Sequence, residues 1–592
     1  MNNMVLSNLV NQTQKFVGVI PLWLPLKQGR HGGTTPTRNV TFTTARMKHI
    51  LLLSILGVSG ASIAFPVAAQ TSPTAPEDIC ISGFNFIGNQ AFDADKLSEI
   101  AWNAIEETPS GDCTRVSFAD ILQARSAVTQ HYINAGYVTS GAYIPAAQEV
   151  RSDGGTVTIE IVEGELTDID ISGNRGLNEN YISSRLRSAT STPLNRNDLV
   201  EALQFLRLDP AIDNITAELS PGIRPGTNIL RVEVEETNPF EFTARLDNNR
   251  SPSVSTLRRG GEASYRNLFG VGDLLSASYF NTDGSDEINL GYEIPFNPQN
   301  GTIGFRYRLS DSEVVEEPFN PLDIQSDYRS YQLEIRQPIV REVDLENAIV
   351  RDFTLGFNFD RQESDTSILG VDFPLSLGAN EDGETRISAF RLSQEFTQRS
   401  NREVFAARSQ FSLGVGWFDS TVNAEAPDSR FFAWRTQLQW FRRLSRGRGD
   451  PPTAPALLLR SDLQLSTQSL VPIEQFGLGG QATVRGYRQD ALLGDNGFLA
   501  SAELLWPVWR WTEAESVLSV VPFVDFGTVW NTSREDLDDS TLVGVGLGLQ
   551  WQQSDRLRAR LDWGIPLVDL DSGEEESWQE NGVYFTIEYN LF

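Results

Sequence analysis

The chain has 592 residues, and with 40% hydrophobic residues it is too apolar for a disordered protein. Its formal net charge is −30, from 48 lysines and arginines against 78 aspartates and glutamates. Because no basic stripe stands out, we expect no nucleic-acid partner. Three histidines and two cysteines are too few for most zinc sites and catalytic triads, and the chain has no Gly-Lys-Ser/Thr phosphate-binding loop. We therefore predict that it is not an enzyme and has no catalytic residue, no metal and no cofactor.

Residues 1–69 are predicted to be absent from the mature protein. A basic start, an apolar run over residues 50–65 and small residues before Gln70 indicate a secretory signal peptide at about 47–69. A transmembrane anchor, the alternative, would need about 20 uninterrupted apolar residues. Residues 1–46 precede a suitable initiator methionine, and we interpret them as a mis-annotated extension. The first 69 residues hold six bases and no acid, so the mature net charge would be −30 − 6 = −36.

The two cysteines, Cys80 and Cys113, would both lie in an exported protein, where disulfides persist. A bridge between them would close a loop of about 34 residues, which on the chain-entropy model is worth roughly 3–4 kcal/mol. Two separate buried thiols are the alternative. We treat the pair as a disulfide candidate.

Residues 78–163 and 164–238 are predicted to form two small domains with the same order of elements, β-α-α-β-β. The first begins with a strand over 79–87. Its second helix is capped by Ser117 with Asp120 three residues on, and its predicted apolar stripe includes Phe118 and Leu122. Its other predicted strands cover 137–144 and 157–162. The second domain is predicted to have a strand near 169–172, helices near 178–188 and 195–208, and strands near 213–219 and 228–235.

Residues 240–592 alternate between apolar and polar side chains with almost no helical periodicity. We predict sixteen antiparallel strands, near 241–249, 257–266, 273–281, 286–295, 301–310, 327–337, 351–361, 385–396, 403–417, 430–444, 456–466, 496–506, 517–528, 541–551, 556–563 and 583–592. Long and short connections mostly alternate, as in outer-membrane barrels, although the gaps at 338–350 and 445–455 are longer than this pattern favours.

A soluble β-sandwich is the alternative for this region. It is disfavoured because Arg556, Arg558 and Arg560 occupy every second position of one strand and would face its core. They suit a wet lumen, with the apolar face of the strand toward lipid. The fold class predicted is therefore a transmembrane β-barrel of sixteen antiparallel strands preceded by two α+β domains.

Several motifs carry a resemblance to a known family. Gly136–Ser140, Tyr143–Pro145 and Val157–Gly164 resemble the first POTRA domain of two-partner secretion transporters of the haemolysin-activation type. The long loop 467–495 contains the motif Val484, Arg485, Gly486 and Tyr487. The thirteenth predicted strand contains the partner motif, with Phe523, Asp525 and Gly527. In POTRA-bearing barrels these motifs belong to the sixth extracellular loop, which folds into the lumen, and to the strand that faces it.

The resemblance implies a pore in the cell outer membrane that secretes one β-helical exoprotein without nucleotide hydrolysis. The exoprotein would present an N-terminal secretion domain to the periplasmic POTRA domains. A monomeric barrel in outer-membrane lipid is expected. Two POTRA domains favour secretion over the alternative, a factor that inserts other barrels. Only residues 70–77, with two prolines, precede the first domain, so no plug helix is expected and closure would depend on the loop.

Arg485 and Asp525 are predicted to form an ion pair inside the barrel. Alternation places Asp525 with Phe523 and Gly527 on one face of its strand, and a lipid-facing carboxylate would be penalised. The alternative is that Arg485 faces solvent at the loop tip. We also expect a resting pore that is mostly closed, and POTRA domains that bind the client by strand addition.

Overall fold

A computed structural model describes residues 79–105, 113–146, 148, 154–344, 347–444, 454–512, 514–535, 539–570 and 577–591. The predicted signal peptide, the N-terminal extension, residues 70–77 and Phe592 lie outside these residues. The chain divides into two compact units, one that holds most of the α+β region up to Glu236 and one that holds the chain from Thr237 onward. No helix among the described residues is long and apolar enough to cross a membrane.

The first α+β domain contains a four-stranded sheet with two helices. Its elements are β1 (Ile79–Ile87), α2 (Ala94–Ala104), β2 (Thr114–Val116), α3 (Phe118–Asn134), β3 (Gly141–Tyr143) and β4 (Gly155–Val162). The sheet order is β2-β1-β4-β3, and β1 pairs with β4 in parallel. Buried Leu97, Ile121 and Tyr132 connect the helices to the sheet.

Helix α3 begins where the sequence predicts. Ser117 Oγ accepts a hydrogen bond from Asp120 N at 3.2 Å, and Ser117 N donates to Asp120 Oδ2 at 2.8 Å, which completes a capping box. These hydrogen bonds from Ser117 lower the pKa of Asp120. The predicted apolar stripe is wrong at Phe118 and Leu122, which are 50% and 37% exposed, because that side of α3 faces away from the sheet.

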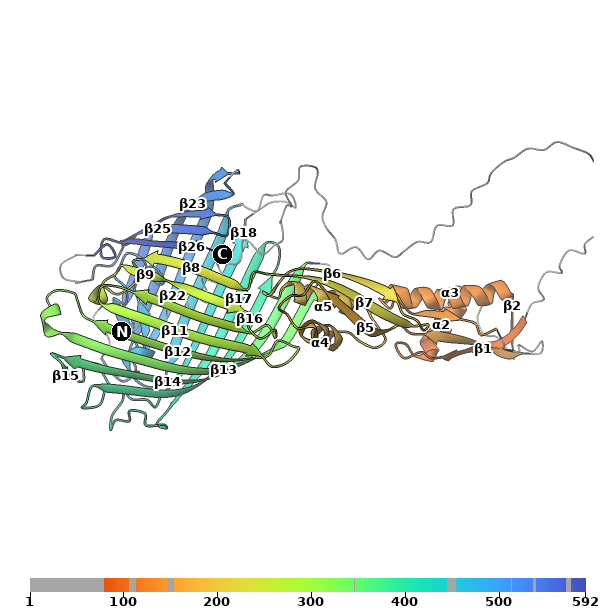
Figure 1. Ribbon diagram of the computed structural model, residues 1–592, viewed down its shortest axis with the longest axis horizontal. Helices are drawn as coiled ribbons and strands as arrows, with labels where there is room; N and C mark the ends of the chain where they lie inside the picture. The colour runs from red at the N-terminus through yellow and green to blue at the C-terminus, as the bar shows by residue number, and fades with distance from the viewer. Residues whose placement is uncertain are drawn as a thin grey trace, which may run out of the picture. The chain divides into compact units, whose positions relative to one another are not determined.

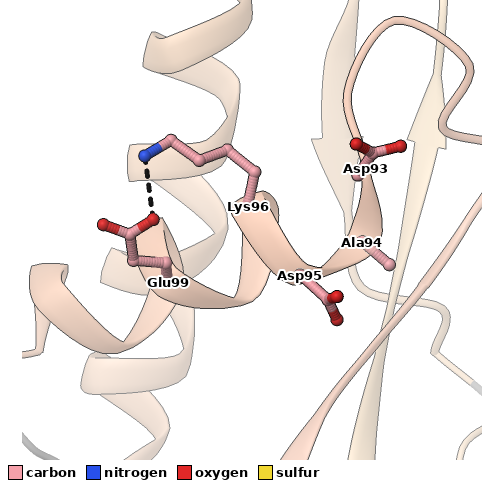
Figure 2. A pocket seen from close by; sticks show the side chains of 5 residues that line it. All are labelled: Asp93, Ala94, Asp95, Lys96 and Glu99. Carbon is pink, nitrogen blue, oxygen red and sulfur yellow. Dashed lines mark hydrogen bonds and ion pairs between the residues drawn. The ribbon is translucent and has the colours of Figure 1, made fainter.

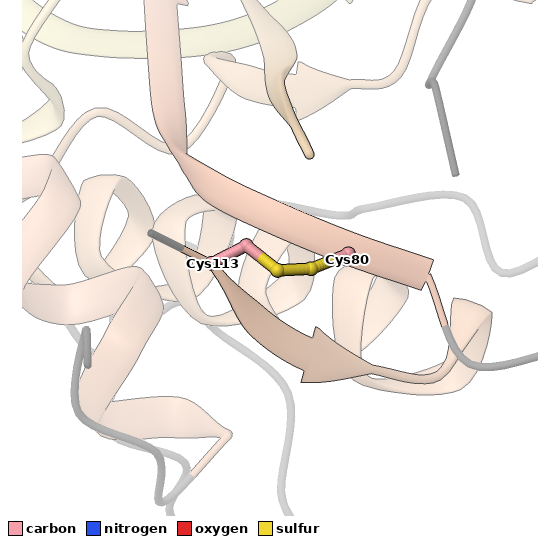
Figure 3. The surroundings of a disulfide bond; sticks show 2 residues. All are labelled: Cys80 and Cys113. Atoms are coloured by element: carbon pink, nitrogen blue, oxygen red, sulfur yellow. A yellow bond between two sulfur atoms is a disulfide. The ribbon is translucent and has the colours of Figure 1, made fainter. Parts of the chain in front are cut away.

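The third strand of this domain is shorter than predicted, and a strand is missed. Residues 137–140 form a turn and only Gly141–Tyr143 pair with β4, because the chain leaves α3 through Gly136 with a φ of 100°. The missed strand is β2, which pairs with the first residues of β1. A disulfide joins Cys80 on β1 to Cys113, the residue before β2, and Figure 3 shows it.

The second α+β domain has a three-stranded sheet and two helices. Its elements are β5 (Glu165–Ser172), α4 (Glu179–Ala189), α5 (Arg196–Arg207), β6 (Ile212–Pro221) and β7 (Thr227–Glu236). The sheet order is β5-β7-β6, with β5 parallel to β7 and β6 antiparallel to it. Leu199, Leu203 and Leu206 lie buried on one face of α5. Both domains thus place their first strand parallel to their last.

The rest of the described chain forms a closed antiparallel barrel (Figure 1). Its strands are β8 (Phe240–Asp247), β9 (Arg258–Arg266), β10 (Leu274–Asn281), β11 (Ser285–Pro295), β12 (Thr302–Glu313), β13 (Ile324–Asp344), β14 (Ile349–Ile368), β16 (Glu384–Arg399), β17 (Glu403–Val415), β18 (Phe432–Arg443), β19 (Ala456–Ser466), β22 (Asn496–Trp511), β23 (Ser516–Trp530), β24 (Thr541–Gln553), β25 (Leu557–Pro566) and β26 (Val583–Asn590). The two-residue β15 (Val371–Asp372) adds to β14, and β26 pairs with β8 to close the circle. The predicted sixteen-stranded barrel is confirmed.

Side chains of the barrel alternate between an exposed apolar outer face and a polar interior. On β23, Val524 and Phe526 are 46% and 38% exposed, whereas Phe523 is 6% and Asp525 is 0% exposed. The outer face suits lipid, and the inner face places charged groups in the interior.

The hairpin of β13 and β14 differs from the prediction. These strands have 21 and 20 residues, and the predicted gap at 338–350 is mostly strand. Pro338 suggests a strand end because it lacks an N–H group. The structure accommodates it at a register shift between Pro338 and Val340, and pairing continues to Asp344.

Candidate functional site

The loop between β19 and β22 packs against the inner wall of the barrel. It contains a 3-10 turn (Pro472–Glu474) and two short paired strands, β20 (Phe476–Leu478) and β21 (Leu492–Gly494), which the sequence did not indicate. An apolar cluster joins it to residues of β22, β23 and β24. The cluster consists of Phe476, Leu478, Val484, Tyr487, Leu492, Leu499, Val529 and Leu542.

Arg485 is completely buried, and the structure brings it to Asp525. Its Nε donates to Asp525 Oδ2 at 2.7 Å, and its Nη2 donates to Oδ1 at 2.8 Å. The backbone N of Arg485 donates to the same carboxylate at 3.2 Å, and Ser501 Oγ donates to Oδ1 at 2.7 Å. The guanidinium lies over the Phe523 ring, 3.4 Å from its centroid. A bidentate, stacked arginine is thus held in one orientation.

Glu503 on β22 is a second carboxylate at this site, and sequence reasoning missed it. Its Oε1 lies 3.0 Å from Arg485 Nη1 and 3.2 Å from Arg460 Nη2, and its Oε2 accepts from Arg560 Nη2 at 3.0 Å. Asp562 on β25 accepts from Arg560 Nε at 2.7 Å. The signal that could have found Glu503 is its inward phase within the apolar run 499–506, where a charge requires partners.

The tip of the loop turns at Gly486, where φ is 109°. Gly486 N donates to the hydroxyl of Tyr584 at 2.9 Å, and that hydroxyl donates to the carbonyl of Tyr487 at 2.6 Å. The Tyr487 hydroxyl lies 3.0 Å from the carbonyl oxygens of Val543 and Val568. Both tyrosines therefore attach the tip by hydrogen bonds to β24, to β26 and to Val568, which follows β25.

Glycines on the wall make room for the tip. A Cβ at Gly544 would lie 1.9 Å from the carbonyl oxygen of Arg485, and one at Gly527 would lie 2.9 Å from Val484 Cγ2. Such contacts are shorter than atoms tolerate, so these positions need glycine for the backbones to approach. All seven motif residues predicted for this site are buried, and the contacts described above bring the loop motif against the motif on β23.

A separate surface pocket at the start of α2 has no buried charge network like that around Arg485. It is lined by Asp93, Ala94, Asp95, Lys96 and Glu99, and Figure 2 shows these side chains. All five are exposed, and Lys96 Nζ is paired with Glu99 Oε2 at 2.8 Å. Among the residues that the structure describes, no cluster of three potential ligands could hold a metal ion. The buried loop cluster is therefore the candidate functional site.

Comparisons with known proteins agree with this architecture. The family model "Haemolysin secretion/activation protein ShlB/FhaC/HecB" matches residues 226–551, and the model "POTRA domain, ShlB-type" matches residues 79–164. The outer membrane transporter CdiB of Dickeya dadantii is 24% identical over 441 residues, covering 72% of this chain and 74% of that protein. The haemolysin transporter HpmB of Proteus mirabilis is 22% identical over 479 residues, covering 77% of this chain and 78% of that protein.

Solved structures share the fold. CdiB from Escherichia coli superposes with a TM-score of 0.66 at 19% identity, covering 89% of this chain and 93% of that chain. CdiB from Acinetobacter baumannii superposes with a TM-score of 0.60 at 17% identity and covers 99% of both chains. These likenesses extend over the α+β domains and the barrel together.

Proposed function

Since this chain belongs to the haemolysin secretion/activation family of outer-membrane two-partner secretion transporters, we propose that it secretes one β-helical exoprotein whose N-terminal secretion domain is recognised by the POTRA domains. The observation that carries this proposal is the family match over the barrel, joined to a loop that packs inside it through Arg485 and Tyr487. A sixteen-stranded barrel without such a loop would leave an aqueous channel. The loop is therefore proposed to close the pore at rest.

The domain boundaries at 78–163, 164–238 and 240–592 are part of this proposal, as is a single barrel in lipid. The outward side chains that support lipid contact include Leu547, Leu549 and Trp551, which are all exposed. Tryptophans at the ends of strands, such as Trp509 and Trp563, suit the membrane interfaces.

Strand β6 is the edge that we propose for client binding. It is ten residues long, and within the described part of the chain it pairs on one side, with β7. The other long edge, β5, has eight residues and carries three acids, Glu165, Asp168 and Asp170, whereas the longer β6 carries two, and charged edges resist strand addition. The edge strand β3 has three residues, and its Ala142 N already donates to Thr129 Oγ1 on α3. An extended client segment would therefore find its longest edge strand in β6.

Proline substitutions along β6 test this proposal in the full-length transporter. Successive N–H groups point to opposite sides of a strand, so of Ala217→Pro and Glu218→Pro one removes an N–H that faces the free edge. In that variant, binding of the purified secretion domain of the exoprotein encoded beside this gene should be weaker, and secretion should be reduced. Glu218→Ala, which keeps the N–H, serves as the control. Unchanged affinity in every folded proline variant would reject β6 as the binding edge.

The gene beside this one separates secretion from the alternative role in barrel assembly. A large exported β-helical product encoded there, whose export stops when this transporter is deleted, would support secretion. A general loss of outer-membrane barrels in the deletion strain, with no such exoprotein, would favour assembly instead.

A further inference from the structure

The loop 467–495 touches the barrel at a second place, through its stem. Arg391 on β16 holds Glu474 with both terminal nitrogens, Nη2 to Oε1 at 2.6 Å and Nη1 to Oε2 at 3.1 Å. Gln362 Nε2 on β14 donates to Glu474 Oε1 at 2.8 Å. The side chains of Glu474 and Arg391 are only 7% and 10% exposed. This is a buried, bidentate ion pair between the loop and the wall.

Apolar contacts reinforce the same attachment. Leu470 and Val471, which precede Glu474, are 0% and 1% exposed and pack with Ile387 and Ala389 of β16. Inward-facing apolar residues are unusual in a wet barrel, and these four cover one another. The stem therefore has both a charged and an apolar contact with the wall.

The two attachments lie on separate parts of the barrel wall, since β16, which carries Arg391, and β23, which carries Asp525, are five strands apart in the closed order. The stem contacts β14 and β16, whereas the tip contacts β23 to β26. In the closed order of sixteen long strands, β14 and β25 are eight strands apart in either direction. The loop thus spans the interior between these two parts of the wall and is held at each of them.

We propose that Glu474 and Arg391 are positioning residues that form a stem latch, which keeps the loop across the pore independently of the Arg485–Asp525 pair. This inference rests on the proposed function, because it concerns the pore that the loop closes. Either attachment alone retains the loop in the lumen, and the pore opens widely only when both are released.

The charges around the latch allow it to be removed without damaging the wall. Arg391 Nε also pairs with Asp360 on β14, and its Nη1 donates to Ser412 Oγ at 2.9 Å. When Glu474 is neutralised, Arg391 therefore keeps a carboxylate partner and no buried charge is left alone. Arg391 itself is a poor target, since its removal would leave Asp360 unpaired.

The test compares Glu474→Ala, Arg485→Ala and the double variant in planar lipid bilayers, with a variant lacking residues 470–494 as the open reference. A charge-assisted buried contact is lost in each single variant, and a second attachment remains. We expect the ratio of open to closed time to rise about tenfold or more in the double variant over either single variant. Secretion should fall most in the double variant.

Glu395→Gln is the matched control. Glu395 lies on the same face of β16 as Arg391, and its ion pairs join it to Arg336 and Arg408 of the wall. It should leave conductance unchanged. Heat-modifiable migration in gels verifies that each barrel is folded. If Glu474→Ala does not insert, Glu474→Gln, which keeps an acceptor for Gln362, replaces it.

The outcomes distinguish the latch from the function on which it rests. If the deletion opens the pore but Glu474→Ala with Arg485→Ala conducts no more than Arg485→Ala, the stem latch is wrong and the loop still closes the pore. If the deletion itself leaves conductance unaltered, the proposal that the loop closes the pore is wrong, and the stem latch is rejected with it.

Discussion

At the scale of single residues, the site shows how a buried arginine is tolerated in a membrane barrel. Arg485 has three acidic side chains within 4 Å, of which Asp525 supplies the bidentate contact and Glu503 and Asp562 lie at 3.0 and 3.7 Å from Nη1. Burying a lone charge costs roughly several kcal/mol, and the carboxylates around Arg485 offset this cost. Because Arg460 and Arg560 share Glu503, the charges form a network rather than one pair.

We expect Arg485→Ala and Asp525→Ala each to impair secretion while the barrel still inserts. After either change the remaining partner keeps other contacts, since Arg485 retains Glu503 and Asp525 retains Ser501. The double variant should secrete about as much as either single variant, because both remove one contact. Secretion of the exoprotein and gel mobility of the folded barrel are the measurements. Losses that multiply in the double variant would contradict a shared role.

Gly544→Ala should displace the tip of the loop. A Cβ there would lie 1.9 Å from the carbonyl oxygen of Arg485, and both atoms belong to backbone that cannot rotate away. We expect raised conductance and reduced secretion, measured against Gly304→Ala. Gly304 also faces inward on its strand, but its Cβ would have 3.7 Å to its nearest neighbour, so this control should behave as wild type. Equal conductance in both variants would show that the tip does not depend on this approach.

Alternation along one strand is enough to predict which side chains face inward, and it placed Asp525, Phe523 and Gly527 on the inner face. It does not give the position of a strand around the barrel. Glu503, Tyr584 and Glu474 were missed because their partners are many residues away and meet only after closure of the barrel and the inward path of the loop. Alternation shows that an inward-facing charged side chain needs a partner, but it does not identify that partner.

At the scale of elements, local signals predicted more than long-range ones. The Ser117–Asp120 capping box follows from four successive residues, and the start of α3 is where it was predicted. By contrast, β13 extends past Pro338 to Asp344, because a register shift against β14 accommodates the missing N–H group. Whether a strand continues through a proline depends on its pairing with the neighbouring strand, which the sequence of one strand does not show.

The capping box makes the stability of the first α+β domain depend on pH. Hydrogen bonds from Ser117 lower the pKa of Asp120, so the folded state favours the carboxylate. The resulting stabilisation is present above the unfolded pKa of about 3.9 and is lost as pH falls through the lower folded value. Asp120→Asn should therefore flatten the decline of the urea midpoint below about pH 4, followed by far-ultraviolet circular dichroism in the helix band. An unchanged pH profile in this variant would contradict the assignment.

At the scale of the whole molecule, the wall of the barrel keeps partners for its buried polar groups when the loop is absent. Arg391 has Asp360 and Asp525 has Ser501 when the loop is absent, and Glu503 keeps Arg460 and Arg560. The wall therefore keeps polar partners for these groups without the loop, and the loop's Arg485 adds the cation that pairs with Asp525. Such a design suits an element that must leave its place while a client passes.

Deletion of residues 470–494 should consequently give a folded barrel that conducts more and secretes nothing. The cut ends lie together in the intact chain, because Leu470 N donates to Asp495 Oδ1 at 2.9 Å, so Ser469 can join Asp495 in a short turn between β19 and β22. Removing the loop opens the water-filled interior that sixteen strands enclose. Single-channel conductance in planar bilayers should therefore rise several-fold. Secretion should be abolished because the deletion also removes Arg485 and Tyr487, which hold the tip on the wall. A folded deletion variant with the conductance of the intact transporter would show that another part of the chain closes the pore.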